Sequence, residues 1–298
     1  MAFDLKEIAR KVREAGRAMG PEGFASMAIY TPFHEKEPYK NVRLERDLSY
    51  GPDERNRLDV FSAPDARQGD DRDVLMFVHG GGFTGGSKNT PGSPYNDNVP
   101  LWAMRSGLVG VNMTYRLAPQ HKWPSGIEDI AGAVDWVRKN IRARGGNPER
   151  VFVHGVSAGA SHVGMYVSHS HVVGGPPIAG AILQSGCYDF THDGLGSPPG
   201  ENQAAYLGTD QSKLAERAAL NGLVETKTAC LYALTEMDPG TFQGYTLRLI
   251  KAYAARRGQW PSFVYLRGHN HFTGTIALNT ADDYFGQQIL AFMDSTKD

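Results

Sequence analysis

The chain of 298 residues has only two cysteines and no excess of charge of either sign. Cys187 and Cys230 cannot form a disulfide framework. We expect them on neighbouring strands, towards opposite ends of a sheet, where their thiols are too far apart to bridge. The 31 basic and 32 acidic residues give a net charge of -1. The positive surface that binding to nucleic acid or an anionic membrane needs is therefore lacking, and we expect neither partner.

Long apolar runs are lacking as well. No stretch of the sequence reaches the roughly 18 consecutive apolar residues of a membrane-spanning helix. Residues 1–7 lack the apolar core of a secretion signal, and Asp4, Glu7 and Glu14 argue against a transit peptide. We therefore expect a cytoplasmic protein. Its composition, 41% hydrophobic and 21% charged, is that of a globular chain long enough to bury a large core.

After about residue 45 the sequence alternates between short apolar runs and amphipathic segments. Strands are predicted at residues 58–61, 74–78, 108–113, 151–153, 181–183, 229–234 and 263–266. Helices are predicted at about 90–106, 125–141, 158–171, 242–256 and 274–293. The second of these helices opens on Ser125 and Glu128, spaced as in a capping box. The alternation predicts an α/β fold with a mainly parallel central sheet and helices on both faces.

Two segments depart from this alternation. Residues 3–19 carry a helical apolar stripe, which favours a helix docked on the body over a moving lid, and residues 20–45 read as an irregular arm. Residues 190–225 contain Pro198, Pro199 and Gly200 and read as an insertion above the sheet. We predict a single domain over residues 1–298, with residues 1–45 as an N-terminal cap or arm.

The motif Gly155-Val156-Ser157-Ala158-Gly159 directly follows a predicted strand and leads into a predicted helix. A reversal this sharp strains the backbone at Ser157 and exposes its hydroxyl above the carboxyl edge of the sheet, as a nucleophile requires. The simpler interpretation is a tight turn whose serine only caps the helix.

A second glycine motif, His79-Gly80-Gly81-Gly82-Phe83, also follows a strand. Three consecutive glycines cost conformational entropy, but they let bare backbone turn its N–H groups towards a reacting carbonyl oxygen. Gly81 and Gly82, together with the N–H of Ala158, would form an oxyanion hole. The competing interpretation is a phosphate-binding loop, but no Lys-Ser/Thr follows at the required spacing. His79 is expected to brace this loop by hydrogen bonds.

The chain resembles the α/β-hydrolase superfamily, and specifically the hormone-sensitive-lipase-like carboxylesterases, over roughly residues 45–295. The resemblance rests on four features that follow one another along the chain. They are the glycine motif at residues 79–83, the run Tyr115-Arg116-Leu117-Ala118-Pro119, then Pro124 with Asp129 and Trp136, and the serine motif at residues 155–159. Those esterases commonly have Asp before the nucleophile and Gly-Gly after the following Ala, whereas this chain has Val156 and Gly159-Ala160. The latter form also resembles the kynurenine-formamidase-like branch.

The resemblance implies the chain order nucleophile, acid, base. After Ser157, Asp238 stands where the strand at 229–234 meets its loop, just before a proline, and Glu236 and Asp189 are its rivals. His269 and His271 both follow the last strand, and the family's His-Phe pattern favours His271-Phe272 as the base.

Metal sites and pocket residues are less well marked. His269 and His271 could pair on a metal but lack a third ligand, and the His162, His169 and His171 group is expected at an exposed helix end. Phe83, Phe190 and Tyr206 are candidates to line an acyl pocket, although a core role fits each equally well. Tyr115 is expected to pack near the site.

The resemblance therefore implies a serine carboxylesterase for small uncharged or aromatic esters that works through an acyl-enzyme, without a metal or organic cofactor. Residues 190–225 would then cover its active site. An arylformamidase or amidase with the same residues stays open, as does a non-catalytic ligand-binding protein on this scaffold. By analogy with the family, a homodimer is expected.

Overall fold

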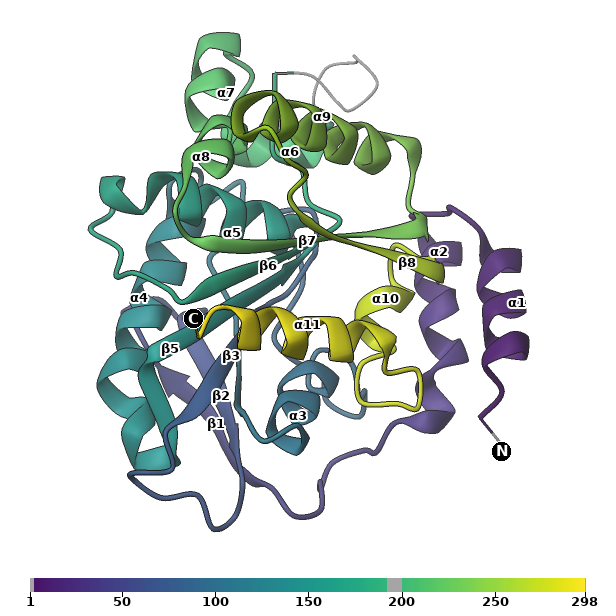
Figure 1. Ribbon diagram of the computed structural model, residues 1–298, viewed down its shortest axis with the longest axis vertical. Coiled ribbons are helices and arrows are strands. Elements are labelled where there is room, and N and C mark those ends of the chain that lie inside the picture. The colour runs from purple at the N-terminus through teal and green to yellow at the C-terminus, as the bar shows by residue number, and fades with distance from the viewer. Residues whose placement is uncertain (1–2, 192–199, 298) are drawn as a thin grey trace.

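The computed structural model describes residues 3–191 and 200–297. In this part of the chain eight strands form one sheet in the order β1-β2-β4-β3-β5-β6-β7-β8 (Figure 1). The strands are β1 (Arg43–Ser49), β2 (Arg57–Ser62), β3 (Arg72–Val78), β4 (Val109–Met113), β5 (Gly146–Val156), β6 (Gly180–Gln184), β7 (Ala229–Met237) and β8 (Ser262–Asn270). β1 and β2 run antiparallel to their neighbours. The pairs from β4 to β8 are all parallel.

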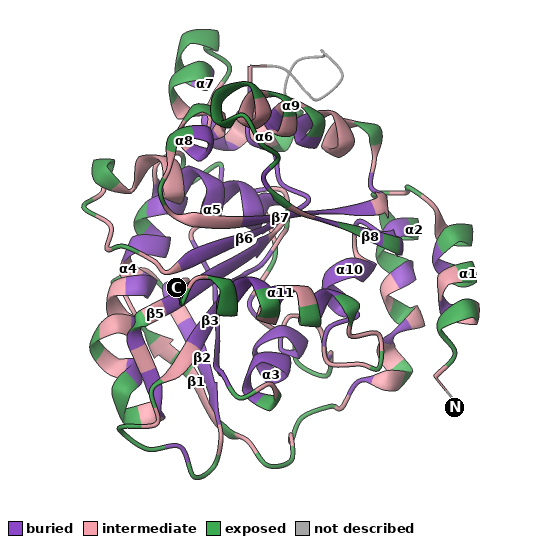
Figure 2. Cartoon of the chain, viewed as in Figure 1, coloured by how far each residue is buried: buried purple, intermediate pink, exposed green. Residues whose placement is uncertain are grey.

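Each central strand supplies side chains to both faces of the sheet, because successive residues of a strand point to opposite sides. In β3, Val74, Met76 and Val78 enter one apolar core, and Leu75 and Phe77 enter the other. The first core is closed by α4 (Ser125–Asn140), α5 (Ala158–His169), α8 (Leu220–Glu225) and α9 (Gly240–Arg257). The second is closed by α3 (Asn98–Arg105) and α11 (Tyr284–Ser295). Figure 2 accordingly shows the central strands as buried.

The predicted α/β architecture, with a mainly parallel sheet covered on both faces, is confirmed. Some of the boundaries predicted from the sequence are wrong. The helix predicted at 90–106 begins only at Asn98, because the preceding residues are turn formers such as Gly92 and Pro94. The helix predicted at 274–293 is split into α10 (Thr273–Ile276) and α11, with the left-handed residue Asn279, at φ +70°, between them. β1 was not predicted, because its side chains are largely polar and half-buried.

The predicted capping box does not form. α4 already includes Ser125 as its first residue, so this serine lies in the first turn and its hydroxyl has no hydrogen-bond partner among the described residues. Glu128 instead accepts a hydrogen bond from the guanidinium of Arg116 at 2.7 Å.

The N-terminal segment docks on the body. α1 (Leu5–Ala15) buries Ile8 and Val12 in a cluster with Met237 and Ile276, at the end of β7 and on α10. α2 (Pro21–Ala25) follows, and Figure 1 shows both helices beside β8. The predicted insertion contains α6 (Glu201–Leu207), α7 (Gln211–Arg217) and α8, and its residues 192–199 lie outside the described part of the chain.

Candidate active site

Ser157 lies in the sharp turn between β5 and α5. Its backbone has φ +57° and ψ -125°, a strained conformation for a residue with a side chain. This strain turns the side chain away from both the strand and the helix, so that the hydroxyl faces the cavity. Ser157 makes no side-chain cap to α5.

The two glycines of the motif are required by close approach. A Cβ on Gly155 would lie 2.5 Å from the carbonyl carbon of Gly159, and one on Gly159 would lie 2.2 Å from the carbonyl oxygen of Val78. Neither position leaves room for a side chain. The turn therefore packs directly against the end of β3, where the second glycine motif begins.

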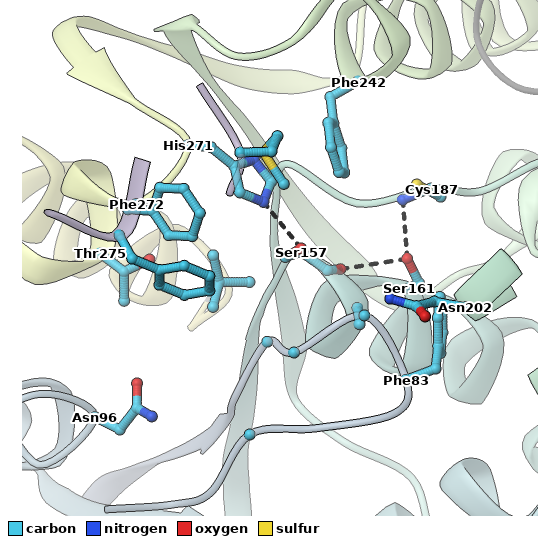
Figure 3. A pocket seen from close by; sticks show the side chains of 18 of the residues that line it. Phe83, Asn96, Ser157, Ser161, Cys187, Asn202, Phe242, His271, Phe272 and Thr275 are labelled. Atoms are coloured by element: carbon cyan, nitrogen blue, oxygen red, sulfur yellow. Dashed lines mark hydrogen bonds between the residues drawn. The ribbon is translucent and has the colours of Figure 1, made fainter. Parts of the chain in front are cut away.

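His271 follows β8 and faces Ser157. Its Nε2 lies 2.9 Å from Oγ of Ser157, and its Nδ1 lies 2.6 Å from Oδ1 of Asp238 (Figure 3 shows the contact with Ser157). An ionised carboxylate can only accept, so Nδ1 carries the proton, and Nε2 of the neutral ring is left to accept the serine hydroxyl. The ring of Phe242 packs on the imidazole, with the ring centres 4.4 Å apart.

Asp238 is completely buried at the end of β7. Burial by itself raises the pKa of this carboxyl, but the hydrogen bond and charge of His271, with further hydrogen bonds, hold the pKa below its usual value. The other oxygen, Oδ2, accepts from Oγ of Ser185 at 2.7 Å and from the N–H of Thr235 at 2.8 Å. The carboxylate is therefore ionised and its orientation is fixed.

The rival carboxylates are committed elsewhere. Glu236 accepts the N–H of Gly268 at 2.7 Å. Asp189 pairs with Arg248 and caps its own loop through Thr191. Neither bonds to His271 or His269 in the described residues.

The rival base, His269, points in another direction. Its Nε2 lies 3.5 Å from Oδ2 of Asp282, and its ring stacks on Tyr30 of the N-terminal segment. Burial lowers its pKa below the usual value, against the charge of Asp282. The structure thus brings His271, and not His269, to Ser157.

The second glycine motif runs alongside the serine. A Cβ on Gly80 would lie 3.2 Å from Cβ of Ser157. Gly81 and Gly82 have φ +132° and +61°, in the range that favours glycine, and the carbonyl of Gly81 accepts the N–H of Gly85 at 3.0 Å. In the described part of the chain the N–H groups of Gly81, Gly82 and Ala158 donate to no protein acceptor, and all three residues line the cavity.

His79, the first residue of this motif, supports the loop by a side-chain hydrogen bond. Its Nδ1 lies 2.6 Å from the carbonyl oxygen of Gly80, and burial lowers its pKa to about 4. Tyr115 stacks on the imidazole and donates its hydroxyl to the carbonyl of His79 at 2.9 Å. Both residues act as the sequence predicts.

The serine opens into a cavity of about 540 Å³. Its walls come from the N-terminal segment, both glycine motifs, α6 and the loop after β8. Among the described residues no Asp, Glu, Lys or Arg side chain lines it. The wall also includes residues that the sequence did not assign to the cavity: Met19, Phe24, Met27, Gly86, Asn96, Ser161, Cys187, Asn202, Gln203, Phe242, Thr275 and Ile276.

Of the three predicted acyl-pocket residues, Phe83 lines the cavity, but Phe190 and Tyr206 do not. Both are buried behind Phe83, whose ring stacks parallel to that of Tyr206 at 5.2 Å. The sequence could not distinguish a wall residue from the layer behind it, because the aromatic rings pack on one another.

His162 is also placed differently from the prediction. It is buried among Phe83, Tyr115 and Tyr206, not at an exposed helix end. Within residues 3–191 and 200–297 no group of three His, Cys, Asp or Glu is arranged to hold a metal ion. Over the same residues no helix is both long and apolar enough to cross a membrane. Cys187 and Cys230 are both free thiols.

Comparison with known proteins gives a consistent family. The pattern of a family described as alpha/beta hydrolase fold matches residues 75–244. The carboxylesterase NlhH of Mycobacterium tuberculosis is 34% identical over 114 residues, which is 38% of this chain and 34% of that protein. The fumonisin B1 esterase of Sphingopyxis macrogoltabida is 30% identical over 240 residues, 71% of this chain and 42% of that protein. The chain thus matches about a third to two-fifths of the length of these relatives.

Solved structures show the same fold over a longer range. Esterase B from Lactobacillus rhamnosis has a TM-score of 0.72 at 16% identity and aligns with 98% of this chain and 96% of its own. An esterase of the bacterial hormone-sensitive lipase family has a TM-score of 0.65 at 20% identity, over 100% and 99% of the two chains.

Proposed function

Since the chain belongs to the alpha/beta hydrolase fold family, we propose that it is a serine carboxylesterase that acts on small uncharged or aromatic esters. One observation carries this proposal. A hydrogen-bonded chain runs from buried Asp238 through His271 to Ser157, and it opens on a cavity with no charged side chain on its described walls. The relatives named as carboxylesterase or esterase support it.

In the first half of the reaction, Oγ of Ser157 attacks the ester carbonyl while Nε2 of His271 takes the hydroxyl proton. The carboxylate of Asp238 stabilises the imidazolium that forms, because Nδ1 and Oδ1 are only 2.6 Å apart. The tetrahedral intermediate collapses when His271 returns the proton to the departing alkoxide. The alcohol leaves and the acyl group stays on Ser157.

The negative oxygen of the intermediate needs donors that are already in place. In this proposal the N–H groups of Gly81, Gly82 and Ala158 supply them, since all three face the cavity without a protein acceptor among the described residues. In the second half His271 takes a proton from a water molecule that attacks the acyl group, and it returns this proton to Oγ of Ser157 as the acid leaves. No metal or organic cofactor takes part in either step.

The cavity supports the proposed substrate class. Its walls are mainly methionine, phenylalanine and small side chains, so a charged group would lose its hydration there without gaining a partner. In this proposal residues 1–45 form a cap and residues 190–225 an insertion over the active site of a single domain. We propose further that the enzyme is cytoplasmic, which agrees with two free thiols, and homodimeric, which gel filtration tests.

Substitution of the nucleophile gives the first test. Ser157→Ala should lower kcat for p-nitrophenyl butanoate by roughly 10⁴-fold or more, because the members of a triad fail as a unit. The parent protein should release a burst of p-nitrophenol and be labelled at Ser157 by a fluorophosphonate. A Ser157→Ala protein as active as the parent would overturn the proposal, and absence of labelling would favour a non-catalytic ligand-binding protein.

An arylformamidase or amidase would use the same residues, since both reactions pass through the same tetrahedral intermediate. Values of kcat/KM for phenyl acetate and N-formylkynurenine, measured side by side, separate the two. A higher value for N-formylkynurenine would replace the esterase assignment.

A further inference from the structure

Most polar side chains on the described cavity wall already form hydrogen bonds with other parts of the protein. Apart from the proposed triad and Cys187, five side chains with hydrogen-bonding groups line the described wall, and four of them bind protein atoms. Asn96 donates to the carbonyl of Ser87 at 2.7 Å, and Thr275 donates to Gln184 at 2.7 Å. Ser161 accepts the N–H of Cys187 at 2.9 Å, and Gln203 accepts the N–H of Gly200 at 3.2 Å. Asn96 and Gln203 each use one end of their amide in these bonds, so each of the four groups has at least one protein partner within the described residues.

Asn202 is the fifth of these side chains. It lies in the first turn of α6, it is exposed, and its amide makes no hydrogen bond within the described part of the chain. Figure 3 draws it on the same side of Ser157 as Ser161, Cys187 and Phe83, with Phe272 and Thr275 on the other side. An uncommitted donor and acceptor therefore face the cavity.

The amide lies beside the proposed oxyanion hole. A Cβ on Gly82 would be 2.8 Å from Nδ2 of Asn202, so the absence of a side chain at Gly82 is what leaves room for it. A group that reaches this amide must therefore belong to a part of the substrate close to the scissile carbonyl.

The position of Asn202 is fixed by the residue one turn later. Tyr206 lies on the same face of α6, four residues on. Its hydroxyl accepts the N–H of Gly126 at 3.0 Å, its carbonyl accepts the N–H of Trp123 at 3.0 Å, and its ring stacks on Phe83. α6 is thus anchored to α4 and to the glycine loop, and this anchoring holds the backbone of Asn202 beside the cavity.

We propose that Asn202 determines specificity and that the enzyme prefers esters with an uncharged hydrogen-bonding substituent, such as a hydroxyl group, close to the scissile carbonyl. A bound substrate that covers the amide without pairing with it displaces its water and leaves it unpaired, which penalises that substrate. A hydroxyl group restores the lost hydrogen bond. This inference rests on the proposed esterase function and adds the substituent that the site recognises.

Matched pairs of esters test the inference. Ethyl butanoate is compared with ethyl 3-hydroxybutanoate, which carries the hydroxyl on the acyl part, and with 2-hydroxyethyl butanoate, which carries it on the alcohol part. Acid release in a pH-stat gives the ratio of kcat/KM, hydroxylated to plain, for each pair. In the parent this ratio should be well above one for at least one pair. In Asn202→Leu, which keeps the size but removes the amide, it should fall about 5–30-fold.

Two further variants complete the design. Asn202→Ala should lower the same ratio, and Thr275→Val, which removes a hydroxyl already bound to Gln184, should leave it unchanged. A ratio near one in the parent for both pairs, or an unaltered ratio in Asn202→Leu, overturns the inference but not the esterase function. So does an equal loss of 100-fold or more on all esters, which would make Asn202 an oxyanion donor. If the parent cleaves none of the three esters, the proposed function fails and the inference fails with it.

Discussion

Two histidines two residues apart have opposite surroundings. The imidazole of His271 lies between Asp238 and Ser157, within hydrogen-bond distance of both. The imidazole of His269 faces Asp282 and Tyr30, on the side of the N-terminal segment. Within the described residues only His271 is therefore within hydrogen-bond distance of the serine hydroxyl, and we expect His269 to order its loop.

This difference predicts unequal losses. His271→Ala should lower kcat roughly 10³-fold or more, because Ser157 then has no base. His269→Ala should lower it about ten-fold through loss of loop order, and it is the matched control. Steady-state kinetics on one p-nitrophenyl ester measures both. A His269→Ala protein that is inactive beside an active His271→Ala protein would reverse the assignment.

The residues of the proposed triad could be predicted from the sequence better than the residues that shape the cavity. Ser157, Asp238 and His271 each directly follow a strand, and strand ends are readable from apolar runs. Ser185, which donates to Asp238, was missed, since nothing in its local sequence shows that its hydroxyl turns to the acid. Asn202 was missed too, because its place depends on the docking of α6.

At the scale of elements, α1 and the residue pair that follows it contact the end of β7, next to Asp238, in two ways. Val12 is completely buried with Met237, the last residue of β7, which directly precedes Asp238. Arg17, just after α1, donates a hydrogen bond to the backbone carbonyl of Asp238. The helix is therefore part of the support of the proposed active site, as well as a cover for β8.

The contribution of α1 can be measured at Val12. Val12→Ala should lower the free energy of unfolding by about 1–3 kcal/mol, because it leaves a cavity beside Met237. The control is Leu5→Ala on the same helix, where the side chain is 51% exposed and the change should stay within about 0.5 kcal/mol. Denaturation in urea measures both. Equal effects of the two substitutions would show that α1 does not pack as described.

Elements with strong apolar periodicity were predicted well, and elements shaped by tertiary contact were not. The buried strands β3 to β7 were recognised because both of their faces are apolar. β1 was missed because its polar side chains, such as Arg46, gain burial only through ion pairs with Asp59 and Asp97. The local sequence around β1 does not indicate these ion pairs, because their partners come from segments distant in the chain.

At the scale of the whole molecule, the interior holds several neutral histidines. Burial lowers the pKa of His154 and of His162 to about 3, and that of His79 to about 4. In the unfolded chain a histidine titrates near 6.5. Between these values the unfolded chain binds protons that the folded protein does not, so acid favours unfolding.

The stability should therefore be complete above about pH 6.5 and fall as the pH decreases towards 4. Each of the three histidines contributes at most about 1.4 kcal/mol per pH unit. His154→Leu should reduce the slope by about that amount, since Phe77 and Phe285 surround the ring. His171→Gln on the exposed surface is the control and should leave the slope unchanged. Urea midpoints from pH 7 to 4.5 supply the slopes, and a flat profile in the parent would contradict the prediction.

The cavity walls described above have a consequence for directed evolution. The proposed triad stands on the ends of β5, β7 and β8, whereas Met19, Phe24 and Met27 belong to the N-terminal segment and Asn202 to α6. These four positions carry no member of the triad or of the oxyanion loop. A combinatorial library confined to these four positions varies the cavity wall while every clone keeps the same proposed triad and oxyanion loop. We therefore expect most clones to stay active and to differ in substrate selectivity.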